Sequence, residues 1–228
     1  MKKSKNLCDT ASCFMCRNCL PEWLPAVALG RKNIKLKKND ILFREGEPVT
    51  GVYFVFSGSL KVYKNWDDEK ELIVRFAKGG AMVGHRGLGN NLVYPISAAA
   101  LEPSVVCFID SNLFEATIKT NPAFTKQLID FLVQELYESE KKMRNLAHMP
   151  VKGRLADAIL QLSSLFGEND KGFIAIDLSR QDLASFAGAT YETVFRVMND
   201  LVKDQLITLS GKSIAIANRD GLLQLAAE

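Results

Sequence analysis

The chain has 228 residues, of which 47% are hydrophobic and 24% charged, with a formal net charge of +3. This composition suits one or two globular domains with buried cores and excludes disordered and fibrous proteins. No segment has the apolar length of a signal-peptide core or of a membrane-spanning helix, so we expect a cytoplasmic protein without a membrane partner.

Four of the five cysteines lie within the first twenty residues, and the fifth is far away; they are Cys8, Cys13, Cys16, Cys19 and Cys107. Cytoplasmic thiols are kept reduced, so crowded cysteines there more often bind a metal or sense redox state than form disulfides. The odd number of cysteines also argues against a disulfide framework. Residues 1–20 are therefore predicted to be a cysteine-rich segment that binds a metal or senses redox state.

The next part of the chain is predicted to be rich in β-strands. Between residues 39 and 109, short runs of aromatic and β-branched residues alternate with Gly, Pro, Asn and Asp. Such runs at close spacing predict short antiparallel strands in a small barrel or sandwich. We assign residues 21–120 to this domain.

A long helix is predicted in residues 121–149. Residues 123–149 contain neither Gly nor Pro, and their apolar residues recur at helical spacing on more than one face. One face would pack on its own domain and another on the same helix of a second copy, which predicts a homodimer. The alternative is a helix buried wholly within one chain.

Residues 150–228 are predicted to form a separate C-terminal domain. The spacing of apolar residues predicts an amphipathic helix over residues 151–166, and the run FIAIDL at 173–178 predicts a short strand. Near the end of the chain, a two-stranded hairpin is expected to turn at Ser210 and Gly211.

Between these elements lies the pattern of two short helices. Ser179 and Asp182 form an N-cap signature for a helix over residues 180–187, Gly188 permits a sharp turn, and Thr190 caps a second helix. Two such helices predict a DNA-binding helix-turn-helix whose second helix enters the major groove. The hairpin behind it would be the wing of a winged helix.

The outer face of the second helix carries side chains that suit DNA. Arg196 can donate two hydrogen bonds to a guanine edge, and Glu192 can accept one from a cytosine amino group. The alternative is an i, i+4 ion pair on a solvated face. Because residues 150–228 have a net charge of −2, phosphate contacts must be local. The predicted DNA-binding residues are Arg180, Gln181, Thr190, Tyr191, Glu192, Phe195, Arg196, Lys203 and Lys212.

The order of these parts resembles the CRP/FNR family of bacterial transcription regulators. The matching residues are Gly46, Gly58 and the run KGGAMVG in the first domain, and LSRQDLASFAGATYETVFRVMNDL in the last. The resemblance implies an α+β fold with a cyclic-nucleotide-binding-like β-roll, a long dimerisation helix and a C-terminal winged helix-turn-helix.

The same resemblance implies the function. It implies a homodimer that binds a pseudo-palindromic operator in double-stranded DNA and works with RNA polymerase. A thiol oxidoreductase or metal hydrolase is the rival class, but the chain has no recognisable Cys–His or carboxylate constellation, so no enzyme activity is expected.

One residue of the recognition helix departs from the family pattern. The family carries Glu, two further residues, Ser or Gly, and then Arg; Glu192 and Arg196 match, while Phe195 stands at the Ser or Gly position. An aromatic ring can contact a thymine methyl group. The outer base of the half-site therefore need not match that of the FNR branch.

The FNR branch resembles this chain in its cysteines and implies a four-iron, four-sulfur cluster that senses oxygen or nitric oxide. Cys13, Cys19 and Cys107 match its ligands, but its first ligand position falls on Thr10. Either Cys8 or Cys16 would then complete the set.

The resemblance also implies a switch. Loss of the cluster would free residues 1–30 and relax the dimerisation helix, which would lower operator affinity. Repulsion across the paired helices between Glu135, Glu138 and Glu140 could hold the form without a cluster near its monomer–dimer balance.

Other signals remain open at this point. Cys8, Cys13, Cys16 and Cys19 alone could hold zinc, and a thiol-redox site is a further alternative. A haem or small-molecule effector could bind the β-roll, although the histidines His85 and His148 are expected to be polar surface residues. Cyclic AMP fits poorly, because His85 and Ile96 stand where cyclic-nucleotide binders of the family carry Glu and Arg.

Overall fold

The computed structural model describes residues 11–67, 70–89 and 92–227. Its internal contacts divide the chain into two compact units. The N-terminal unit comprises Met1–Asn65 and Val74–Leu136, and the C-terminal unit comprises Trp66–Ile73 and Tyr137–Glu228.

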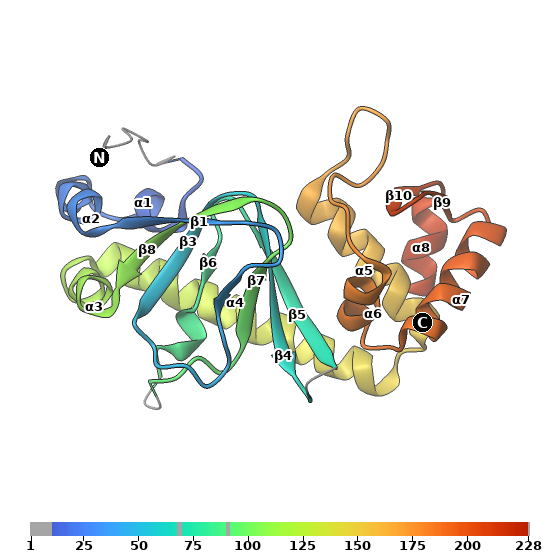
Figure 1. Cartoon of the computed structure of the whole chain (residues 1–228), viewed down its shortest axis with the longest axis horizontal. Helices are drawn as coiled ribbons and strands as arrows, with labels where there is room; N and C mark the ends of the chain where they lie inside the picture. The colour runs from blue at the N-terminus through green and yellow to red at the C-terminus, as the bar shows by residue number, and fades with distance from the viewer. Residues whose placement is uncertain (1–10, 68–69, 90–91, 228) are drawn as a thin grey trace. The chain divides into compact units, whose positions relative to one another are not determined.

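Two four-stranded antiparallel sheets form the body of the N-terminal unit (Figure 1), in agreement with the predicted barrel or sandwich. The first sheet has the order β1-β8-β3-β6 and the second the order β2-β7-β4-β5. The strands are β1 Lys32–Leu36, β2 Ile41–Phe43, β3 Gly51–Ser57, β4 Ser59–Asn65, β5 Glu71–Lys78, β6 Met82–Val83, β7 Ser97–Ala100 and β8 Ser104–Asp110.

Strand alternation sends side chains of the first sheet into two separate cores. Along β3, Val52 and Phe54 join a core that contains the N-terminal cysteines, whereas Tyr53 and Val55 join the core between the sheets. Along β8, Cys107 falls on the face that carries Val52 and Phe54. A residue distant in sequence therefore lies in the same core as the cysteine segment.

Helices cover the cysteine-bearing side of this sheet. They are α1 Phe14–Asn18, the 3-10 turn η1 Pro21–Trp23, α2 Leu24–Gly30, α3 Ser111–Thr120 and α4 Pro122–His148, with a second 3-10 turn, η2 His85–Gly87, after β6. The predicted long helix is confirmed as α4. Among the described residues, no helix is both long and apolar enough to cross a membrane.

The C-terminal unit contains the predicted winged helix. Its elements are α5 Val151–Phe166, α6 Arg180–Ala187, α7 Tyr191–Lys203, the hairpin strands β9 Ile207–Ser210 and β10 Ser213–Ile216, and α8 Arg219–Leu225. The hairpin pairs Ser210 with Ser213, so its turn lies at Gly211 and Lys212, one residue later than the predicted Ser210 and Gly211.

The prediction of a strand at residues 173–178 is wrong. This run forms only an isolated bridge between Ile174 and Glu168, and the Ile174 amide donates to the carbonyl of Ile214 at 2.9 Å. Ile174 and Leu178 are buried, but the run is otherwise without ladder partners among the described residues. The alternation of apolar residues arises because the buried side chains of Ile174 and Leu178 hold a loop against the core.

Candidate functional site

Three of the N-terminal cysteines are placed around one short helix. Cys13 is the N-cap of α1, Cys16 lies within it and Cys19 is its C-cap. All three are buried, with exposed fractions of 7–8%. A spacing of three residues keeps side chains on roughly one face of a helix. Cys8 lies outside the described residues.

Hydrogen bonds hold this segment against the sheet and its helices. The Phe14 amide donates to the Gly80 carbonyl at 3.0 Å, and the Leu20 amide donates to Oδ1 of Asn121 at 3.0 Å. A little further on, the Trp23 indole donates to Oγ1 of Thr117 at 2.9 Å. The cysteine segment is thus attached to the sheet turn before β6, to α3 and to Asn121 between α3 and α4.

Gly80 allows the close approach of the cysteine segment. Its φ of +89° lies in the left-handed region, and a Cβ at this position would collide with the backbone oxygen of Ser12. The glycine of the KGGAMVG run therefore has a steric role, which its sequence context alone does not reveal.

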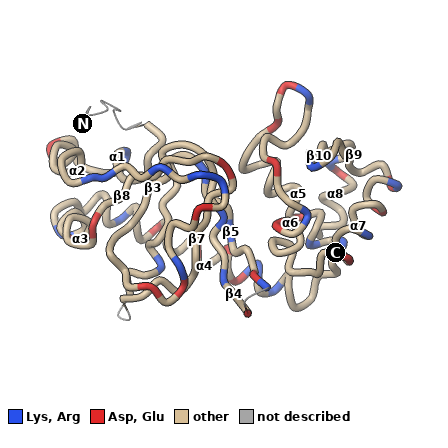
Figure 2. The backbone as a smooth tube through the Cα atoms, in the orientation of Figure 1, with Lys and Arg blue, Asp and Glu red and all other residues tan. Residues whose placement is uncertain are grey.

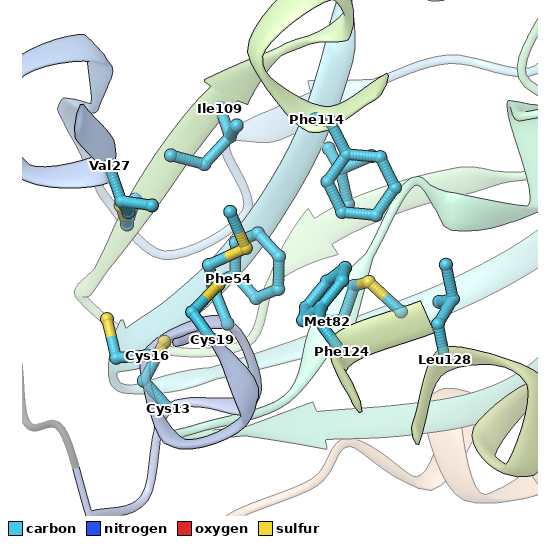
Figure 3. Packing of buried hydrophobic residues seen from close by; sticks show 13 residues of the cluster. Cys13, Cys16, Cys19, Val27, Phe54, Met82, Ile109, Phe114, Phe124 and Leu128 are labelled. Carbon is cyan, nitrogen blue, oxygen red and sulfur yellow. The ribbon is translucent and has the colours of Figure 1, made fainter. Parts of the chain in front are cut away.

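Cys107 belongs to the same buried core as the three N-terminal cysteines. Figure 3 shows Cys13, Cys16 and Cys19 together around α1, beside Phe54 of the sheet. Burial, and then the nearby Cys13, raises the pKa of Cys19 to about 11. The Cys19 thiol is therefore protonated at neutral pH unless a cation compensates for the loss of hydration.

Four buried thiols are the donor set of an iron–sulfur or zinc centre. Among the described residues, no three His, Cys, Asp or Glu side chains converge closely enough to hold a metal ion. The donor chemistry fits such a centre, while its binding requires the thiols to turn toward a common point.

Aromatic contacts connect α1 with α4. The Phe14 ring lies 5.3 Å from that of Phe131 and 5.8 Å from that of Phe124, measured between centroids. Phe131 in turn packs edge-on against His85, with the ring centroids 4.9 Å apart. Phe14, between Cys13 and Met15, is thus in direct contact with α4.

One turn beyond Phe131, Glu135 lies against two arginines and a histidine. Its Oε2 lies 2.9 Å from Nη2 of Arg86, 3.5 Å from Nε of Arg75 and 3.5 Å from Nε2 of His85. Burial alone would raise the pKa of Glu135, but the facing His85, Arg75 and Arg86 outweigh it and lower the pKa to about 2. Glu135 therefore stays ionised and fixes α4 to the sheet body.

This arrangement corrects two expectations. Glu135 is directed at its own unit with 18% of its side chain exposed, so it does not repel a partner helix as predicted; Glu138 and Glu140 are exposed. His85 is buried, with 3% exposed, and is not a polar surface residue, whereas His148 is exposed. Burial lowers the pKa of His85.

The helix-turn-helix in the C-terminal unit has the predicted caps. Oγ of Ser179 accepts from the Asp182 amide at 2.9 Å, and Oγ1 of Thr190 accepts from the Thr193 amide at 3.3 Å. Gly188 ends α6 in the left-handed region with a φ of +65°. The Arg154 guanidinium, on α5, donates to the carbonyls of Ala187 and Gly188 and so fixes the turn.

The recognition helix α7 separates a buried face from an exposed one. Val194, Val197, Met198 and Leu201 are buried, whereas the predicted base-contacting residues are exposed. No ion pair joins Glu192 and Arg196, although i, i+4 pairs of this kind form on α3 and α4. The exposed residues in the first part of the helix are Tyr191, Glu192, Phe195, Arg196 and Asn199, and those near its end are Asp200, Val202 and Lys203.

The remaining predicted DNA contacts differ in their availability. Arg180 donates to the carbonyls of Gly211 and Lys212 at 2.9 and 3.1 Å, so its guanidinium connects the start of α6 to the wing turn. The other side chains predicted to contact phosphates are exposed: Gln181, Thr190, Lys203 and Lys212.

Figure 2 shows Lys and Arg concentrated in and around β1 of the N-terminal unit. Residues 31–38 supply five of them, of which Lys32 and Lys35 lie on β1, an edge strand of the first sheet, and three lie next to it. Exposed lysines on an edge strand disfavour pairing with another chain. This basic segment thus has a structural explanation within its own unit.

Two sequence models of protein families match the chain. One, described as a cyclic nucleotide-binding domain, matches residues 33–121, and the other, a Crp-like helix-turn-helix domain, matches residues 153–225. Together these ranges cover the sheets and the winged helix.

Characterised relatives are similar over most of the chain. A transcriptional activator protein anr from Pseudomonas aeruginosa is 31% identical, covering 84% of this chain and 79% of the relative. An anaerobic regulatory protein from Bacillus subtilis is 33% identical, covering 89% and 86%. The solved structure of FixK2 from Bradyrhizobium japonicum is 25% identical, with a TM-score of 0.78, and covers 87% of this chain and 98% of that one.

Proposed function

The chain belongs to the CRP/FNR family of bacterial transcription regulators, and we propose that it regulates transcription in response to oxygen or nitric oxide through an N-terminal iron–sulfur cluster. Its helix-turn-helix makes it a DNA-binding protein, and the members of its family are transcription regulators and not enzymes. The carrying observation is that Cys13, Cys16, Cys19 and Cys107 share one buried core. A relative is named an anaerobic regulatory protein, which supports oxygen as the signal.

We assign the ligands to Cys13, Cys16, Cys19 and Cys107. Cys16 is preferred to Cys8 because it lies in the helix that Cys13 and Cys19 cap and in the same core as these two cysteines. When bound, a four-iron, four-sulfur cluster supplies oxygen-labile redox chemistry. The protein supplies the thiolates, holds α1 on Gly80 and Asn121, and excludes water by burial.

The signal would reach α4 through the contacts of Phe14. If α1 moved on loss of the cluster, the Phe14 ring would lose its contacts with the rings of Phe124 and Phe131. Glu135 and its arginines hold the next turn of α4 in place. Directly coupled packing of this kind lets one segment bias the position of another.

The opposite side of α4 supplies a dimer interface. Ile129, Leu132, Val133 and Leu136 expose 52%, 40%, 61% and 59% of their surface within one chain. Four large apolar side chains on one helix favour burial against a partner copy. A homodimer would present two recognition helices to a pseudo-palindromic operator in double-stranded DNA, from which the protein would act on RNA polymerase in the cytoplasm.

The test is anaerobic purification followed by analysis of iron, sulfide and zinc, with the absorption spectrum recorded before and after air. About four iron and four sulfide per chain are expected, with loss of both in Cys107→Ala and Cys16→Ala but not in Cys8→Ala. Operator affinity should fall after air exposure. Unchanged DNA binding after complete loss of the cluster would refute the proposed switch.

A structural zinc site is the second candidate, because thiolates also suit zinc. It predicts about one zinc per chain, no visible chromophore, and retention of the metal in Cys107→Ala if Cys8 completes the site. The same metal analysis thus separates a cluster that includes Cys107 from a zinc site confined to the N-terminal segment.

A further inference from the structure

Two exposed aromatic rings stand side by side on the outer face of the recognition helix. Tyr191 and Phe195 expose 43% and 53% of their surface, their ring centroids are 6.3 Å apart and their planes differ by 16°. Neither ring belongs to the core, because the inward face of α7 is filled by the buried side chains Val194, Val197, Met198 and Leu201. Their packing therefore does not explain why aromatic residues occur here.

The rings lie among side chains that suit base edges. Glu192 and Arg196 flank Phe195 on the exposed face and make no ion pair with each other. All three fall within the first two turns of a helix that begins at Tyr191, which is the part of a recognition helix that reaches base edges. Phe195 is thus an apolar group between a hydrogen-bond acceptor and a bidentate donor.

The major groove offers one apolar group on its base edges, the C5-methyl of thymine. A ring at the position of Phe195 can cover that methyl group, but it cannot satisfy the donors and acceptors of the other bases. The stacking partner matters as well, because Tyr191 restricts the rotamers of Phe195 before binding. A side chain that is already ordered loses less conformational entropy when it meets DNA.

We propose that Phe195, positioned by Tyr191, selects a C5-methylated pyrimidine in each operator half-site, next to the base pairs that Glu192 and Arg196 contact. The inference rests on the proposed sequence-specific DNA binding and adds the chemistry of one base. Phe195 determines specificity by touching the base, and Tyr191 is a positioning residue.

The first experiment selects bound duplexes from a randomised pool with the full-length protein and four variants. Wild type should enrich thymine at one position of each half-site, and Phe195→Ser should lose that preference while it keeps the neighbouring ones. Tyr191→Phe should keep the preference, because the ring remains, and Tyr191→Ala should weaken it. Val202→Ser is the matched control, since Val202 is exposed on the same helix about two turns further on.

The second experiment changes only the methyl group. Replacing that thymine with deoxyuridine should weaken binding of the wild type by about fourfold, the effect of one buried methyl group, and should leave Phe195→Ser unaffected. In a duplex with cytosine at this position, 5-methylation should strengthen binding of the wild type.

The possible failures are distinguishable. If the wild type enriches no motif, the proposed sequence-specific binding fails and the inference falls with it. If the wild type enriches a motif that Phe195→Ser leaves intact, or if deoxyuridine binds as tightly as thymine, the regulator remains and the aromatic readout is overturned. A surface for a protein partner would then explain the rings.

Discussion

Replacing Glu135 by Gln tests whether the ionic cluster holds α4 on the N-terminal unit. Glutamine keeps the size of the side chain but removes its charge, which leaves Arg75 and Arg86 facing a neutral group. A carboxylate whose pKa falls from 4.5 to about 2 on folding contributes about 3 kcal/mol at neutral pH. We therefore expect Glu135→Gln to lower the free energy of unfolding of this unit by about that amount.

The pH dependence follows from the direction of the shift. Because folding lowers the pKa of Glu135, its contribution is complete above about pH 4.5, declines as the pH falls, and is lost near pH 2. Glu135→Gln does not titrate at this position. The difference in stability between wild type and variant should therefore be constant from pH 7 to about pH 5 and should shrink below that.

Urea denaturation followed by tryptophan fluorescence measures this difference. Trp23 is a suitable reporter because its indole is hydrogen-bonded to Thr117 inside the N-terminal unit, whereas Trp66 is 87% exposed and should change little. Protein concentration is kept fixed, since dimerisation contributes to apparent stability. Glu140→Gln serves as the control, because Glu140 is an exposed acid on the same helix.

Two results would refute the reasoning. One is a loss of stability in Glu135→Gln no larger than in Glu140→Gln. The other is a difference between wild type and Glu135→Gln that stays the same down to pH 3, because a packing defect does not titrate.

Three further predictions concern the cysteine segment, the dimer and the helix-turn-helix. Gly80→Ala should speed alkylation of the N-terminal thiols, measured by mass spectrometry, because the new Cβ collides with that segment; Gly89→Ala has open space and should not. Val133→Glu should give a monomer by sedimentation velocity with unchanged helix content, since this exposed residue lies on the proposed interface. Ser179→Ala should lower the free energy of unfolding by about 1 kcal/mol, measured by thermal or urea denaturation, because α6 loses its N-cap and the Asp182 amide its acceptor. An unchanged midpoint would exclude a contribution from the cap.

Local signals predicted the helical half of the fold well. The cap residues Ser179 and Thr190 and the turn at Gly188 are sequence features whose physical effect lies within a few residues. The same holds for α4 and α5, whose apolar spacing and lack of internal breakers define long helices. In these segments local propensity and tertiary packing favour the same structure.

Elements defined by distant partners were harder to predict. Strand β1 is rich in lysine and mostly exposed, and it is a strand because it pairs with β8 about 70 residues away. The run 173–178 alternates like a strand but forms only an isolated bridge with the described part of the chain. His85 and Glu135 lie 50 residues apart, and only the fold shows that they face each other and that His85 is buried. No periodicity in the sequence encodes such pairs.

The arginines of the C-terminal unit bear on how it recognises DNA. Arg154 donates to carbonyls of the helix-turn-helix and Arg180 to those of the wing turn. Both side chains therefore stabilise the shape of the winged helix. With a net charge of −2 over residues 150–228, few cations remain for phosphate contacts, and the salt dependence of binding should be modest. Affinity must then come in larger part from the base edges. A recognition helix in this position gains more from an apolar contact such as that of Phe195 than one surrounded by lysines would.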